Sequence, residues 1–350
     1  MKILNCNEAV SRQAVTVISI LFLTACLFCA CQRNEEGSGK QPSGAALDST
    51  ATSPSSAAPA APSPEDIAWC EQFRPPWGDE VWENWWRRNP EAGEKWFTET
   101  PERMKSVDFQ RIAKCTHIEN MLVAFAPLKD LKPFEKLTAL KRLDIRFAMG
   151  VSDLTPLSGL HNLEFLGLWG TSVSDLSPLI GLDSLKEINA RMTKISDLKP
   201  LLKMKSITTI DLLKAPVSDI SPLAQIPRIT EIMTCSTLIN DLSPLYPVAE
   251  RITYLDLCNV PFRDFAELKR FKNLKTIKLW GLPLGSLDIL SELRQLEYID
   301  LTGAVYDSLT PLEKLPALKK VDIIGNKVND AELESLKKKL PELEVVTQSE

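Results

Sequence analysis

Few residues in this chain have the types and spacing that catalysis requires. The two histidines, His117 and His161, lie far apart in the sequence. We find no metal-ligand spacing, no glycine-rich phosphate loop and no nucleophile elbow. Many aspartates stand in repeated Ser-Asp-Leu segments, where the side chain is expected to cap a turn. We therefore expect no enzyme activity, no metal and no small-molecule cofactor.

The cysteines offer the clearest chemistry, which is cross-linking. We predict one disulfide between Cys70 and Cys115, joining the N-terminal segment to the first repeat. Cys235 and Cys258 occupy equivalent slots of neighbouring repeats. Adjacent strands lie about 4.8 Å apart, inside the Cα range of roughly 4.4–6.8 Å that a disulfide needs. We predict a second disulfide there, and both pairings suit an oxidising compartment.

The elements that position these residues come from an internal repeat of 22 residues. Triplets of alternating character recur at one slot, and their spacing is regular, since 188 − 166, 210 − 188 and 321 − 299 are each 22. The triplets include Leu166-Gly167-Leu168, Ile188-Asn189-Ala190, Ile210-Asp211-Leu212, Ile277-Lys278-Leu279, Ile299-Asp300-Leu301 and Val321-Asp322-Ile323. A fixed period of this length predicts a solenoid.

One repeat shows how each unit is expected to fold. Residues 165–169 alternate and predict a short strand with two side chains directed inward. Residues 174–179 predict a tight turn, in which Asp175 caps backbone N–H groups and Pro178 prevents a long helix. A single unit buries too little apolar surface to offset the ordering of its residues. Stacking against neighbouring repeats is therefore what stabilises it.

The pattern Leu-x-x-Leu-x-x-Leu-x-Leu followed by Val-Ser-Asp-Leu-x-Pro-Leu recurs at 151–157, 173–179, 195–201 and 217–223. It resembles the bacterial leucine-rich repeat proteins of the 22-residue internalin-like class. The resemblance implies an α/β leucine-rich repeat solenoid. Such a fold has a parallel concave β-sheet, short 3-10 or turn segments on the convex side, a helical N-terminal cap and a C-terminal helix–strand cap.

This chain departs from the family pattern in the loop after each strand, where the family often has a ladder of asparagines. Here only Asn326 keeps the amide. The other positions are Thr171, Thr193, Ala215, Thr237, Val260, Leu282 and Ala304. We expect the threonine hydroxyls to serve part of the loop backbone instead.

The N-terminus has the layout of a lipoprotein signal peptide, with an apolar run and small residues before a cysteine. Cys26 is the expected lipidation site, and Cys31 is the alternative. Cys26 has the better residues before it, whereas polar residues follow Cys31 at once. An uncleaved transmembrane anchor over residues 14–31 is a third reading. We expect a lipid-anchored protein of the cell envelope, at the outer membrane or facing the periplasm.

The rest of the chain divides by composition. We expect a lipoprotein signal peptide over 1–25, a disordered Pro/Ala/Ser-rich tether over 26–66, a Trp-rich helical N-terminal cap over 67–111, leucine-rich repeats over 112–330 and a C-terminal cap over 331–350. The N-terminal cap holds Trp69, Trp77, Trp82, Trp85, Trp86 and Trp96. These rings either cover the open end of the solenoid or form a platform for a glycan. The net charge of −5 gives no basic excess for nucleic acid.

The outward positions of the strands define a candidate binding face. We predict partner-binding residues at Arg146, Phe165, Trp169, Arg191, Leu213, Tyr254, Trp280 and Tyr298. Trp, Tyr and Arg are enriched at interface hot spots, and exposed aromatic patches mark binding sites. We expect the aspartates beside them to form a solvated row.

Three functions fit such a face. The first is binding of a protein or peptide partner, the second is binding of a glycan or peptidoglycan, and the third is a passive envelope scaffold.

Overall fold

The structure is a computed structural model that describes residues 62–76 and 99–347. The chain divides into two compact units, 1–63 and 64–350. The expected signal peptide, both lipidation candidates and five of the six N-terminal tryptophans lie outside the described residues. Within the described ranges, no helix is long and apolar enough to cross a membrane.

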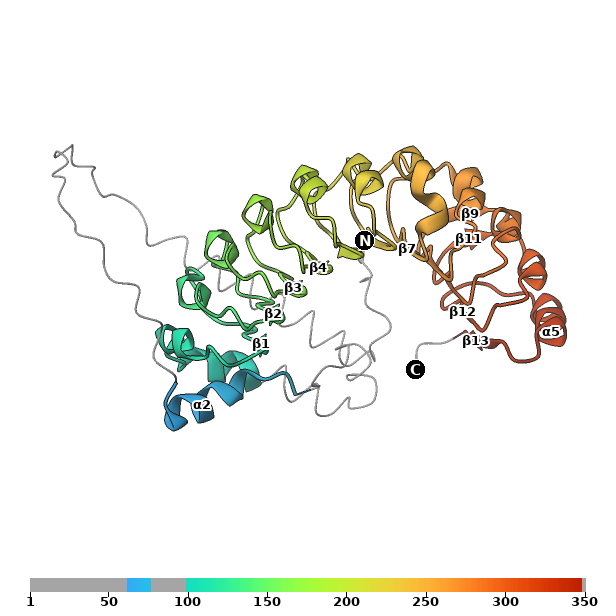
Figure 1. Ribbon diagram of the computed structural model, residues 1–350. Helices are drawn as coiled ribbons and strands as arrows, with labels where there is room; N and C mark the ends of the chain where they lie inside the picture. The colour runs from blue at the N-terminus through green and yellow to red at the C-terminus, as the bar shows by residue number, and fades with distance from the viewer. Residues whose placement is uncertain (1–61, 77–98, 348–350) are drawn as a thin grey trace, which may run out of the picture. The chain divides into compact units, whose positions relative to one another are not determined.

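The repeats stack through one parallel sheet of 11 strands that lines the inner side of an arc (Figure 1). Neighbouring strands pair without slippage, so that Leu166 lies opposite Ile188 and Ile188 lies opposite Ile210. This register confirms the 22-residue repeat. The strands are β1 (Asn120–Leu122), β2 (Arg142–Asp144), β3 (Phe165–Gly167), β4 (Glu187–Asn189), β5 (Thr209–Asp211), β6 (Glu231–Met233), β7 (Tyr254–Asp256), β8 (Thr276–Lys278), β10 (Tyr298–Asp300), β12 (Lys320–Asp322) and β13 (Glu344–Val346).

Short 3-10 helices form the convex side, as the resemblance implied. They are η3 (Lys132–Phe134), η4 (Thr155–Leu157), η5 (Ser177–Leu179), η6 (Lys199–Lys203), η7 (Ser221–Gln225), η8 (Ser243–Arg251), η9 (Phe265–Arg270), η10 (Leu287–Leu290) and η11 (Thr310–Lys314). The Asp175 carboxylate accepts the backbone N–H of Ser177 at 2.8 Å. The same bond recurs at Asp153, Asp197, Asp219 and Asp241. These aspartates are therefore turn caps.

The inward leucines of strand and turn form one continuous core. Leu166, Leu168, Leu176 and Leu179 are fully buried, and their equivalents in the other repeats are buried in the same way. A second, small sheet pairs β9 (Pro283–Gly285) with β11 (Val305–Tyr306), which the repeat pattern does not predict.

Threonines replace the asparagine ladder in part, as expected. The hydroxyls of Thr171, Thr193 and Thr237 each donate to the carbonyl three residues earlier, at 2.7–2.8 Å. Asn326 donates instead to the carbonyl of Ala304 in the preceding repeat, at 2.5 Å.

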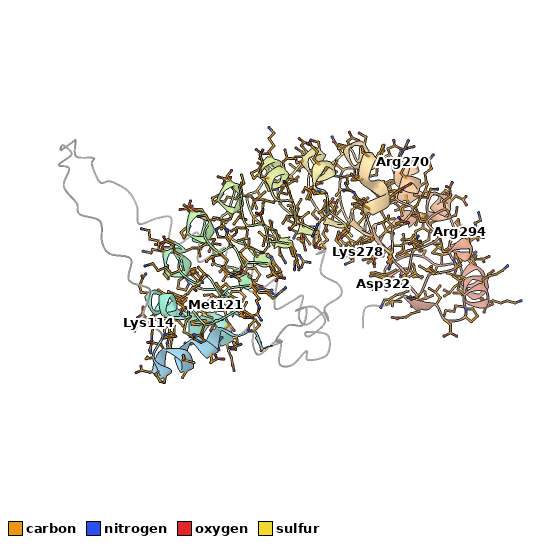
Figure 2. The ribbon with its side chains drawn as sticks, viewed as in Figure 1. Lys114, Met121, Arg270, Lys278, Arg294 and Asp322 are labelled. Carbon is orange, nitrogen blue, oxygen red and sulfur yellow. A yellow bond between two sulfur atoms is a disulfide. The ribbon has the colours of Figure 1, made fainter. Side chains whose placement is uncertain are left out.

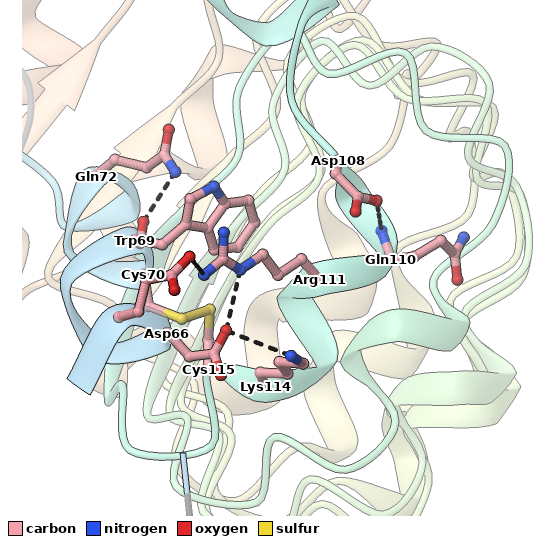
Figure 3. Close-up of polar contacts among 10 residues, drawn as sticks. Asp66, Trp69, Cys70, Gln72, Asp108, Gln110, Arg111, Lys114 and Cys115 are labelled. Carbon is pink, nitrogen blue, oxygen red and sulfur yellow. Dashed lines mark hydrogen bonds and ion pairs between the residues drawn. A yellow bond between two sulfur atoms is a disulfide. The ribbon is translucent and has the colours of Figure 1, made fainter. Parts of the chain in front are cut away.

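Helices and a disulfide cover the N-terminal end. This end comprises α2 (Pro64–Cys70), η1 (Glu71–Phe73), helical residues 99–105 and η2 (Phe109–Lys114). The expected disulfide is present between Cys70 and Cys115, with a Cα–Cα distance of 5.5 Å (Figure 3). Arg111 donates to the Asp66 and Glu65 carboxylates at 3.0 Å each.

The start of α2 corrects one expected boundary. The helix begins at Pro64, so the last three residues of the expected tether are helical. Proline suits a first helical turn, and the carboxylates of Glu65 and Asp66 suit the positive end of the helix dipole.

A helix and a strand close the C-terminal end. α5 (Asp330–Lys339) begins after Asn329, whose side chain accepts the N–H of Ala331 at 3.0 Å. Three lysines occupy its last turn, where cations suit the helix dipole. The chain then returns as β13, which pairs with β12 and covers its edge.

Candidate partner-binding face

A side-chain bond shapes the inner face of five repeats. In each of them the third strand residue, an aspartate or asparagine, folds its side chain back so that its Oδ1 accepts the N–H two residues later. The bond is seen at Asp144 (3.0 Å), Asn189 (3.3 Å), Asp211 (3.1 Å), Asp256 (3.0 Å) and Asp300 (2.9 Å). Asp144, Asp211 and Asp256 are buried. The expectation of a solvated row is therefore wrong for these three, because they serve the turn that ends each strand.

A left-handed residue follows each of these turns. Among the described residues, positive φ recurs every 22 or 23 positions, at Phe125, Phe147, Gly170, Met192, Lys214, Ser236, Asn259, Gly281, Gly303 and Gly325. Glycine adopts this conformation at no steric cost, whereas other residues are strained by roughly 1–2 kcal/mol. The first two repeats place phenylalanine rings in a slot that glycine fills in the third repeat and again from Gly281 onward.

We call Phe125, Arg146, Phe147, Trp169 and Arg191 the arginine–aromatic patch. Phe125 and Phe147 stack with ring centroids 4.7 Å apart, and Phe147 lies at the same distance from Trp169. The guanidinium carbons of Arg146 and Arg191 lie 5.9 and 5.6 Å from the Trp169 ring centroid. Both distances fall within cation–π range. The repeat stacking thus places two arginines around one indole ring.

Carboxylates hold both of these arginines in place. Arg146 pairs with Asp144, and its Nε lies 2.9 Å from the carboxylate. Arg191 pairs across the strands with Asp211. Each carboxylate therefore orients its arginine as well as closing its turn.

Part of the predicted binding stripe is covered rather than exposed. Arg146, Phe165 and Trp169 are only 5%, 8% and 7% exposed. Arg142 covers Phe165, with its guanidinium carbon 4.1 Å above the ring centroid. The expectation that all outward positions are accessible is wrong, because strands about 4.8 Å apart bring large neighbouring side chains into contact. Five of the predicted residues stay half-exposed, namely Arg191, Leu213, Tyr254, Trp280 and Tyr298.

All eight predicted residues lie in strands of the large sheet or two residues after them. The structure therefore places them along one side of the solenoid. Sequence reasoning missed Phe125 and Phe147, although aligning the repeats places both in the slot that holds Gly170 and Gly281. It also missed Lys278, which lies with Asp322 on the inner side of the arc, whereas Arg270 and Arg294 lie on the outer side (Figure 2).

A second group on this face is polar, and we call Tyr254, Lys278, Tyr298, Asp300 and Asp322 the tyrosine–carboxylate cluster. The Tyr298 hydroxyl donates to Asp322 Oδ2 at 2.6 Å. The Lys278 ammonium lies 5.7 Å from the Tyr254 ring centroid. Burial raises the pKa of Tyr254 to about 12 and also raises the pKa values of Asp300 and Asp322. Charge is therefore disfavoured at these two carboxyl groups.

The cysteine pair between the two groups differs from its prediction. Cys235 and Cys258 are both buried, and no disulfide joins them. Their side chains leave neighbouring parallel strands side by side, and bonding would require the two Cβ atoms to converge to about 3.5–4.5 Å. Burial raises the pKa of the Cys258 thiol to about 12.

The curved parallel sheet, the 22-residue repeat and the convex 3-10 helices define a leucine-rich repeat solenoid. Two solved structures with this fold are an internalin, inlF, from Listeria monocytogenes and a leucine-rich repeat protein of Leptospira interrogans. The first match has a TM-score of 0.58 and 20% identity, covering 70% of this chain and 71% of the internalin. The second has a TM-score of 0.54 and 16% identity, with coverages of 67% and 68%.

These neighbours share the leucine-rich repeat fold with this chain. At such low identity the likeness concerns the fold alone. No protein-family model matches the sequence, and no curated protein matches it.

Proposed function

We propose that this protein binds a protein or peptide partner through the inner face of its solenoid and catalyses no reaction. The observation that carries the proposal is the half-exposed stripe of Arg191, Leu213, Tyr254, Trp280 and Tyr298. Four of these residues are of the types enriched at interface hot spots. The curved sheet presents them on consecutive or nearby strands, as an extended ligand requires.

The covered residues support this surface from beneath. Arg146 and Trp169 are buried, and Arg146 is held by Asp144. Side chains that are ordered before binding lose less conformational entropy when a partner arrives. In this proposal Arg191, which pairs with Asp211 and lies over Trp169, is the most rigid contact residue.

We further propose that the solenoid is displayed from a membrane in the cell envelope by a lipid on Cys26 or Cys31. This proposal rests on the sequence alone, since both cysteines lie outside the described residues. The disulfide between Cys70 and Cys115 agrees with an oxidising compartment.

A glycan ligand is the second candidate, supported by the indole ring of Trp280. Trp69 offers it little, because its ring centroid lies 5.1 Å from that of Phe73 and 5.1 Å from the Arg111 guanidinium carbon. Because Phe73 and Arg111 already contact this ring, less of it is free to stack on a sugar.

The deciding experiment compares matched variants in affinity capture from an envelope extract. Leu213→Ala/Trp280→Ala removes two half-exposed apolar side chains from the inner face. Ile180→Ala/Leu202→Ala removes two exposed side chains outside it, which are 44% and 37% accessible. We expect a specific protein to be captured by wild type and the control pair and to be reduced at least about tenfold in the inner-face pair.

Equal recovery of every protein by all three would contradict the proposal. Co-sedimentation with purified peptidoglycan tests the glycan alternative separately. Sedimentation that depends on Trp280 and not on Leu213 would favour the glycan.

A further inference from the structure

Three potential metal ligands converge between β6 and β7. Within the part of the chain that the structure describes, Cys235, Asp256 and Cys258 form the one group of three His, Cys, Asp or Glu residues suited to a metal ion. Their ligand atoms all lie within 4.8 Å of one another, and all three residues are buried. Two sulfurs bound to one zinc ion at about 2.3 Å each lie about 3.8 Å apart. Small side-chain rotations therefore bring these atoms into coordination distance.

The sheet register explains why the three meet. Met233 of β6 lies opposite Asp256 of β7. Cys235 and Cys258 stand two residues after these strand ends. The parallel pairing continues there, because the N–H of Ser236 donates to the carbonyl of Cys258 at 2.8 Å. Because side chains two residues apart along an extended chain share a face, all four belong to the same side of the sheet.

We propose that Cys235, Asp256 and Cys258 bind a zinc-class divalent cation. Two thiolates and one carboxylate are a donor set that Zn²⁺ accepts. Three protein ligands leave a fourth coordination position for water or a ligand atom. The thioether of Met233 is adjacent but is a poor donor to zinc, which sets it apart from the three ligands.

The surrounding charges fit a bound cation. Each thiol releases its proton to solvent on coordination, so two thiolates and the Asp256 carboxylate carry three negative charges against two on the metal. Lys278 of β8 lies opposite Asp256 of β7, so its positive charge stands beside the remaining negative charge. A coordinated metal deprotonates a cysteine thiol outright.

The proposal is tested by titrating the full, reduced chain with Co²⁺, a spectroscopic substitute for zinc. We expect a thiolate-to-cobalt charge-transfer band that saturates at this site and disappears when Zn²⁺ is added. Cys258→Ser and Asp256→Asn should each weaken binding at least about tenfold, as disturbed metal sites typically do. Asp256→Asn keeps an acceptor for the Cys258 N–H and therefore preserves the turn.

Met233→Leu is the matched control, because it preserves apolar volume beside the site and should leave the cobalt affinity unchanged. The N-terminal cysteines are common to all variants, so only differences between variants are interpreted. Melting temperatures measured without metal show whether each variant folds. Equal cobalt binding in folded wild type, Cys258→Ser and Asp256→Asn would overturn the proposal. Loss of binding in Met233→Leu would overturn the assignment of ligands.

Discussion

The strand-end aspartates of the inner face lie in opposite electrostatic surroundings in the two halves of the sheet. In the N-terminal half, the strand-end carboxylates of Asp144 and Asp211 each pair with an arginine. In the C-terminal half, Asp300 and Asp322 are half-buried and have raised pKa values. Where this slot holds an aspartate that closes the turn, the turn uses only its side-chain oxygen as an acceptor. Whether the charge of such an aspartate stabilises or destabilises the fold therefore depends on the side chains of the adjacent positions, such as a paired arginine.

The sharpest test of this contrast is the same substitution in both halves. Asp211→Asn keeps an acceptor for the N–H of Leu213 but removes the charge that pairs with Arg191. We expect it to lower the free energy of unfolding by about 2 kcal/mol, below the 3–5 kcal/mol of a fully buried pair because Arg191 is partly exposed. Chemical denaturation monitored by circular dichroism measures the change.

Asp300→Asn is the matched substitution in the C-terminal half. It keeps an acceptor for the N–H of Thr302 and removes a charge that burial disfavours. We expect no loss of stability at neutral pH and a small gain. If both variants lose the same amount, the contrast between the halves is wrong.

The pH dependence of stability separates the halves more finely. Burial raises the pKa values of Asp300 and Asp322 in the folded state, above the unfolded value of about 3.9. The folded state then binds more protons than the unfolded state, so these groups contribute stability at low pH that is lost as pH rises through their folded pKa values. The double variant Asp300→Asn/Asp322→Asn removes this pH-dependent contribution to the free energy of unfolding.

We therefore expect the double variant to be more stable than wild type at pH 7, by less than the loss in Asp211→Asn. Its advantage should shrink as the pH falls toward about 4, where wild-type carboxyl groups are protonated on folding. Urea denaturation at a series of pH values measures the difference. An advantage that is constant with pH would show that the two carboxyl groups titrate normally.

The sequence was enough for the fold because the core side chains repeat. Leu166, Ile188 and Ile210 stand at equal spacing and all point inward, so the period determined both the strands and their register. The caps at Asp153 and Asp175 followed from local rules, since each bond spans two residues. Spacing alone also brought Cys235 beside Cys258, although it did not decide whether they are bonded.

The candidate face was only partly predictable, because accessibility depends on contacts between repeats. Trp169 is an outward residue by spacing, yet Phe147 and two arginines cover much of its ring. The aspartates looked solvated because period-two alternation says nothing about a side chain that bends back onto its own backbone. Outward spacing therefore identifies only candidate contact residues. The side chains at adjacent positions determine which of these residues a partner can reach.

The smallest expected effect concerns the left-handed slot after each strand, which holds different residues along the solenoid. Lys214 is exposed and has a φ of 57°, in a slot where Gly281 and Gly303 stand in later repeats. Lys214→Gly relieves roughly 1–2 kcal/mol of strain but adds about 0.5–1 kcal/mol of unfolded-state entropy. We expect a net gain of about 0.5 kcal/mol, measured as a small rise in the denaturation midpoint at an unchanged slope.

The same substitution at Phe147 should have the opposite sign. Phe147→Gly relieves similar strain but removes ring contacts with Phe125 and Trp169, each at 4.7 Å between centroids. Aromatic pairs contribute about 0.5–1.5 kcal/mol each beyond the burial of their surface, so the lost contacts outweigh the strain. If Phe147→Gly instead stabilises the protein as Lys214→Gly does, the rings in the N-terminal half are not held by their mutual packing. Their presence in a strained slot would then need a partner to explain it.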